Sequence, residues 1–111
     1  MVERTERRLS VSGLTKEELD LLRMVFGRYP GVREVRLYGS RARGAGRTNS
    51  DIDLALFGDL SSLECRRIHS ELDELPLPYR FDVTAYNRLT DPAIKSRIDK
   101  EGITLYAGTA E

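Results

Sequence analysis

The stretch that decides the fold runs from Leu37 to Phe57 and reads LYGSRARGAGRTNSDIDLALF. It begins and ends in apolar residues, and between them lie three arginines, three glycines and the two aspartates Asp51 and Asp53. The apolar ends predict two strands, and the glycine-rich middle predicts a turn between them. Two aspartates at the start of a buried strand repel each other and cost stability unless protons or cations compensate their charge. Their presence at this position therefore indicates a functional site.

The spacing of the two aspartates predicts that they act together. In a strand, residues two apart point to the same face and lie ~6.6 Å apart. We therefore expect Asp51 and Asp53 to share one face, while Ile52, Leu54 and Leu56 face the core. Carboxylate oxygens are the ligands that Mg²⁺ prefers, and Mn²⁺ accepts them as well.

A third carboxylate comes from the stretch RFDVTAY at residues 80–86, which also predicts a strand. Its Phe81, Val83 and Ala85 would face the core, and Asp82 the opposite side. If this strand lies beside the one after the turn, Asp82 joins the other two aspartates. Three carboxylates can hold two divalent ions ~3.5–4 Å apart, which suits phosphoryl or nucleotidyl transfer. Asp82 would then accept the proton of an attacking hydroxyl or bind one of the ions.

The turn predicts a phosphate site beside these carboxylates. Gly39 allows the backbone to approach a phosphate closely, and Ser40 offers a hydroxyl and a backbone N–H. Arg41 or Arg43 would neutralise charge on a departing pyrophosphate. The sequence leaves open which arginine does so, and a plain surface position is an equal alternative for each. Ser50, the last residue of the turn, either contacts a phosphate or only ends the turn.

The remaining segments complete an α-β-β-α-β-α-β order. Capping boxes at Thr15 and Ser61 predict the starts of two helices, and Asp91 followed by a proline predicts a third. Strands are expected at residues 32–39, 51–57, 80–86 and 103–107. This order predicts an α/β (α+β) domain in which helices cover a small sheet of about four strands.

Length and composition limit the classes of function. The 111 residues predict one domain spanning 1–111, with residues 1–10 as a flexible tail. The formal net charge is zero, which argues against strong nucleic-acid binding by this chain alone. The absence of a long apolar run or a signal peptide predicts a cytoplasmic protein without a membrane span. Cys65 is the only cysteine, so it cannot form an intramolecular disulfide, and we expect it in the core.

Gly39-Ser40, ten further residues and then Asp51-Ile52-Asp53 resemble the signature of the DNA polymerase β-like nucleotidyltransferase superfamily. The longer string GSRARGAGRTNSDIDLALF resembles its minimal nucleotidyltransferase (MNT) group, and RFDV and EGITLYA extend the resemblance over nearly the whole chain. The resemblance implies a mixed sheet flanked by helices and two Mg²⁺ ions on Asp51, Asp53 and Asp82. It also implies that Gly39 and Ser40 hold the nucleotide phosphates.

The resemblance also implies a reaction. Members transfer AMP from ATP to a hydroxyl, and minimal members are commonly antitoxins (MntA type) of HEPN/MNT toxin–antitoxin pairs, some of which AMPylate a tyrosine of the HEPN ribonuclease toxin. No motif residue departs from the family pattern, so we expect an active enzyme with a partner protein as acceptor. Two alternatives stay open: an antitoxin that binds and occludes its toxin without catalysis, and a nucleotidyltransferase with a small-molecule acceptor.

Overall fold

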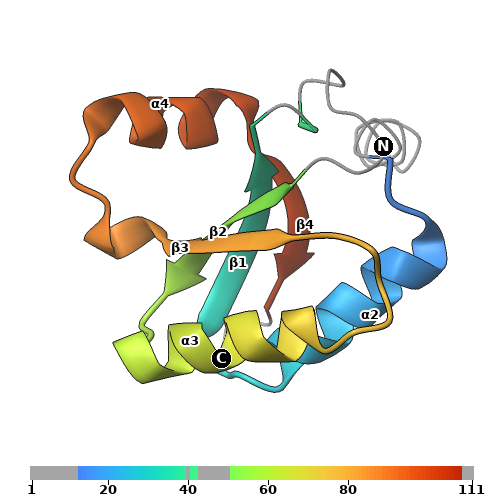
Figure 1. Ribbon diagram of the computed structural model, residues 1–111. Coiled ribbons are helices and arrows are strands. Elements are labelled where there is room, and N and C mark those ends of the chain that lie inside the picture. Colours follow the sequence, from blue (N-terminus) through green and yellow to red (C-terminus); the bar gives the residue numbers. More distant parts are fainter. Residues whose placement is uncertain (1–12, 40, 43–50, 109–111) are drawn as a thin grey trace.

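The computed structural model describes residues 13–39, 41–42 and 51–108 (Figure 1). The tail predicted for residues 1–10 lies outside these ranges. The order of elements is as predicted, with one additional 3₁₀ helix, η1. The elements are α2 (Lys16–Gly27), β1 (Val32–Tyr38), β2 (Ile52–Gly58), α3 (Ser62–Asp73), β3 (Phe81–Ala85), η1 (Tyr86–Arg88), α4 (Pro92–Glu101) and β4 (Ile103–Ala107).

The four strands form one mixed sheet in the order β3-β2-β1-β4. β1 is antiparallel to both β2 and β4, whereas β2 and β3 are parallel. Two parallel strands need a crossover connection, and here the connection contains α3. Because β2 and β3 run in the same direction, both begin at the same end of the sheet. Asp51, Asp53 and Asp82 lie at this end.

Helices cover both faces of the sheet. α2 and α3 lie along one face, and α4 lies on the other (Figure 1). The main core forms between the first two helices and the sheet, and includes Phe26, Ile68 and Leu54. Ala55 and Ile98 are fully buried outside that cluster, on the side of α4. None of the described helices combines the length and the apolar character that crossing a membrane requires.

The predicted helix starts are confirmed. At α2, Thr15 and Glu18 form reciprocal side-chain to backbone hydrogen bonds of 3.1 and 3.0 Å. Ser61 and Glu64 form the same capping box at α3. At α4 the carboxylate of Asp91 accepts from a backbone N–H, and a proline occupies the first turn. These caps satisfy backbone donors that a helix leaves unpaired.

β3 and Cys65 lie at the margin of the core. Of the three β3 residues predicted to face the core, Phe81 is buried, Val83 is half-buried and packs against the core, and Ala85 is half-buried, since β3 is an edge strand. Cys65 is also half-buried, at the margin of the core, where its Sγ lies 3.7 Å from Nη1 of Arg88. The alternation predicted for β2 is confirmed, because its apolar positions 52, 54 and 56 are at most 1% exposed.

Candidate functional site

Three side chains lie in a row across neighbouring strands, at the end of the sheet where β2 and β3 begin. Tyr38 of β1 pairs with Asp53 of β2, and Asp53 pairs with Asp82 of β3. Directly paired residues point to the same face of a sheet. This face is opposite the main core, because Ile52 and Leu54 on either side of Asp53 are buried in that core. The sheet therefore brings together two carboxylates that are far apart in sequence.

The electrostatics of this row centre on Asp53, which is half-buried. Burial raises the pKa of the Asp53 carboxyl, and the negative charges of Asp82 and Asp51 raise this pKa further. Asp51 is exposed and directly precedes β2, and Asp82 is exposed on β3. The three carboxylates thus lie within electrostatic reach of one another, and their charges oppose ionisation of the central one.

The donor set of this row fits a divalent cation. Carboxylate oxygens are hard ligands, and a cation between Asp53 and Asp82 would relieve the repulsion that raises the pKa of Asp53. Within the described ranges, however, no three acidic, histidine or cysteine side chains are gathered closely enough to hold a metal ion. The structure therefore brings Asp53 and Asp82 together as a pair, with Asp51 beside them along the chain.

The backbone of the glycine turn lies against the carboxylate of Asp53. Gly39 has φ +82°, and a Cβ added to it would lie 2.5 Å from Oδ2 of Asp53. The N–H of Ala42 donates to the carbonyl oxygen of Gly39 at 3.1 Å and closes the turn. Only glycine combines this φ with so close an approach. Ser40, Arg43 and Ser50, the other predicted residues of the turn, lie outside the described residues.

Arg41 is the one predicted turn arginine that the structure describes, and its side chain is buried, with 3% of the residue exposed. Its guanidinium carbon lies 4.8 Å from the centre of the Tyr79 ring, a cation–π contact. The alternative of a plain surface position is therefore wrong for Arg41, because its charge is enclosed by the protein. Tyr79 itself is half-buried.

Comparison with known proteins identifies the family. The model of the family "Polymerase beta, Nucleotidyltransferase" matches residues 20–110. The chain belongs to this family. The match covers the sheet and every described helix except the first four residues of α2. The predictions of a nucleotidyltransferase and of its fold are thereby confirmed.

Solved structures share the fold of this nucleotidyltransferase. A chain in the crystal structure of a toxin–antitoxin with AMP-PNP is 23% identical, with a TM-score of 0.64 over 86% of this chain and 75% of that chain. A chain in the structure of a tri-AMPylated Shewanella oneidensis HEPN toxin in complex with MNT antitoxin is 18% identical, with a TM-score of 0.57 over 92% of this chain and 73% of that chain. Among curated proteins, none matches the sequence.

One neighbour of the carboxylates in this nucleotidyltransferase was missed from sequence. Tyr38 belongs to the strand predicted at residues 32–39, is half-buried and lies in register with Asp53. Its hydroxyl is hydrogen-bonded to that of Thr84 on β3, so its side chain spans β2. Burial raises the pKa of the Tyr38 phenol, and Asp53 and Asp82 add to the rise, whereas the bond to Thr84 opposes it. The long turn before Asp51 hides this register from sequence inspection.

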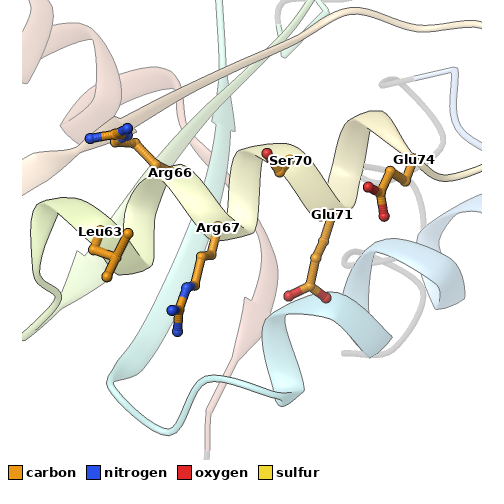
Figure 2. A pocket seen from close by; sticks show the side chains of 6 residues that line it. All are labelled: Leu63, Arg66, Arg67, Ser70, Glu71 and Glu74. Atoms are coloured by element: carbon orange, nitrogen blue, oxygen red, sulfur yellow. The ribbon is translucent and has the colours of Figure 1, made fainter.

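Two cavities that described residues line lie away from the carboxylates. One, of about 310 Å³, lies along α3, and Figure 2 shows its lining side chains, Leu63, Arg66, Arg67, Ser70, Glu71 and Glu74. Glu71 accepts hydrogen bonds from Arg28 and Tyr29 after α2, so it joins the two helices. The other cavity, of about 560 Å³, lies at the far end of β2 beside Gly58 and Asp59. Neither contains a predicted site residue.

Proposed function

We propose that this nucleotidyltransferase transfers AMP from ATP to a hydroxyl of a partner protein, a HEPN-type toxin, and thereby acts as its antitoxin. The observation that carries the proposal is the in-register pair of Asp53 and Asp82 with Gly39 packed against it. The similar structures add support, since one is of a toxin–antitoxin with AMP-PNP and another contains a tri-AMPylated HEPN toxin with MNT antitoxin.

In this proposal Asp51, Asp53 and Asp82 hold two Mg²⁺ ions, or Mn²⁺ in their place. Bound there, the ions would neutralise the triphosphate and lower the pKa of the attacking hydroxyl. The acceptor oxygen bonds to the α-phosphorus of ATP, the bond from that phosphorus to the bridging oxygen breaks, and pyrophosphate leaves. The exposed carboxylate of Asp82 accepts the hydroxyl proton.

The glycine turn binds the phosphates in this proposal. Gly39 and Ser40 supply backbone N–H groups, and Ser40 adds its hydroxyl. Arg43 and Ser50 are proposed as further phosphate contacts, in accordance with the sequence prediction. Arg41 has a different environment, which suggests a separate role.

The acceptor is proposed to be a protein because the formal net charge is zero and no excess of basic residues favours a nucleic acid. A HEPN toxin would bring its own hydroxyl to the row of carboxylates. Since ATP and the ribonuclease targets of such toxins are cytoplasmic, we propose a cytoplasmic location for this protein as well.

The direct test is transfer of label from ATP. The protein is incubated with Mg²⁺, a lysate of its source organism and ATP labelled at either the α- or the γ-phosphate. We expect a labelled protein band with α-label only, because a kinase would transfer the γ-phosphate instead. The variants Asp53→Asn and Asp82→Asn should lose the band. Asp59→Asn, an exposed aspartate after β2, is the matched control and should retain it.

Other outcomes would separate the alternatives. Mg²⁺-dependent ATP binding without any labelled protein would favour the occluding antitoxin, and label on a low-molecular-mass product would favour a small-molecule acceptor. Label that persists in both Asn variants would contradict the proposed roles of Asp53 and Asp82.

A further inference from the structure

Arg41 follows the proposed phosphate turn closely in sequence, yet its side chain is directed into the protein. Its charge is enclosed, with 3% of the residue exposed. Burying a guanidinium is costly unless aromatic rings, hydrogen bonds or anions compensate the lost hydration. The groups that contact the Arg41 guanidinium therefore indicate the role of this residue.

The ring of Tyr79 links Arg41 to the first turn of α2. The guanidinium carbon lies 4.8 Å from the ring centre, and the Tyr79 hydroxyl donates to the Glu18 carboxylate, 3.0 Å from either oxygen. Glu18 also accepts the backbone N–H of Thr15 in the capping box. The Tyr79 ring thus lies between a cation and an anion, and both charges act on its phenol, whose pKa is raised mainly by burial.

A second segment also closes on the guanidinium. A Cβ added at Gly13, which has φ +80° just before α2, would lie 3.2 Å from Nη1 of Arg41. Ala42 and Tyr79 pack against the main core. Arg41 therefore joins the turn to the start of α2 and to the segment that leads into β3.

These contacts lie on the side of the sheet that α2 and α3 cover (Figure 1). Glu18 belongs to α2, which packs on the core face, whereas Asp53 and Asp82 occupy the opposite face. A guanidinium stacked on Tyr79 is thus directed away from the carboxylate row. Gly39 nevertheless touches Asp53, so any shift of the turn changes the distance between bound phosphates and the carboxylates.

We propose that Arg41 is a positioning residue that anchors the nucleotide-binding turn to α2 through Tyr79 and does not itself bind the phosphates. The inference rests on the proposed function, because it assumes that the turn binds a nucleotide. It assigns the Tyr79–Glu18 contact the same task, although neither residue belongs to the family signature described above.

The test is a double-mutant cycle on nucleotide affinity. Binding of AMP-PNP with Mg²⁺ is measured for wild type, Arg41→Met, Tyr79→Leu and the double variant, at a temperature where circular dichroism shows all four folded. We expect each single variant to weaken binding about tenfold, and the double variant to be no weaker than either. Tyr79→Phe keeps the ring beneath the guanidinium but loses the hydrogen bond to Glu18, so it should weaken binding, though by less than Tyr79→Leu does.

Salt dependence provides a second readout. A direct ion pair with a phosphate is screened by salt. If Arg41 only positions the turn, the affinities of Arg41→Met and wild type should fall equally steeply as salt increases. A flatter dependence in Arg41→Met, together with wild-type affinity in Tyr79→Leu, would overturn the inference in favour of direct phosphate binding.

The remaining outcomes are also decisive. If both single variants have lower thermal stability but unchanged AMP-PNP affinity, the contact between Arg41 and Tyr79 is purely structural. That result would overturn the inference and leave the proposed function standing. Wild-type protein that binds no AMP-PNP with Mg²⁺ would overturn the proposed function, and the inference with it.

Discussion

At the scale of single residues, Gly39 and Asp53 are in contact between the end of β1 and the start of β2. The absence of a side chain at Gly39 lets the turn backbone lie where a Cβ would approach the Asp53 carboxylate to 2.5 Å. Asp53 in turn is half-buried and surrounded by negative charge. In the proposed function, this contact would bring the phosphates held by the turn close to a cation held by Asp53.

Replacing Gly39 with alanine tests the close approach. The positive φ and the clash with Asp53 should lower the free energy of unfolding by about 1 kcal/mol or more and abolish label transfer. Urea denaturation measures the stability. Gly27→Ala is the control, because a Cβ there meets only Tyr106 Oη at 4.0 Å and the position is helical. An equally stable Gly39→Ala protein would contradict the described turn.

The raised pKa of Asp53 predicts a pH-dependent stability. A carboxyl whose folded pKa exceeds its unfolded value of about 3.9 favours folding at low pH, and loses that contribution as pH rises through the folded pKa. Without divalent cations, Asp53→Asn should therefore raise the melting temperature at neutral pH, and the gain should shrink as pH falls through the folded pKa. Thermal unfolding in EDTA measures both effects.

Adding Mg²⁺ or Mn²⁺ should reverse the order of stability. Wild-type protein should gain melting temperature with the cation, whereas Asp53→Asn should gain little, because a ligand is lost. A variant that is destabilised in EDTA at neutral pH would contradict the electrostatic description of Asp53.

At the scale of elements, local signals determine where each helix begins, and strand pairing determines what the helices bring together. The α3 crossover makes β3 parallel to β2, which places Asp82 beside Asp53. The capping box of Ser61 and Glu64 defines the first turn of that crossover helix.

Removing the cap of α3 should reduce stability without affecting the site directly. Ser61→Ala leaves backbone donors of the first turn without their side-chain partner and should cost about 1 kcal/mol of unfolding free energy. Ser62→Ala, an exposed neighbour inside the helix, is the matched control and should be close to neutral. We expect AMP-PNP affinity to stay unchanged for folded Ser61→Ala protein, and a large loss would connect α3 to the site.

At the scale of the whole molecule, the sheet separates two apolar layers of unequal size. The larger lies against α2 and α3, and the smaller, on the side of α4, contains Ala55 and Ile98. Tyr86 adds a polar and an aromatic contact to the smaller layer. Its hydroxyl donates to Asp99 of α4, and its ring stacks on that of Phe57 with the ring centres 4.4 Å apart.

The smaller layer should contribute substantially to stability. Ile98→Ala leaves a cavity at a fully buried position and should lower the free energy of unfolding by about 2–5 kcal/mol. Ile94→Ala, on the same helix but half-buried, should cost clearly less. Equal losses in urea denaturation would show that α4 is not attached through Ile98.

The sequence by itself determined the order of the elements, the helix caps and the alternation of β2, because these signals lie within a few residues of each other along the chain. It also determined the family, since the Gly-Ser and Asp-x-Asp motifs are each made of residues that are neighbours along the chain. The sequence did not determine how deeply a residue is buried on an edge strand, as for Val83, which packs against the core but is only half-buried.

Only the tertiary structure decided the strand order β3-β2-β1-β4 and the register that aligns Tyr38, Asp53 and Asp82. It also decided the burial of Arg41, because the residues next to an arginine in a turn do not indicate whether its side chain is buried or exposed. These features depend on contacts between residues far apart in sequence, such as Tyr79 with Glu18. Chain periodicity does not encode such contacts, because they form only when the packed sheet and helices bring the segments together.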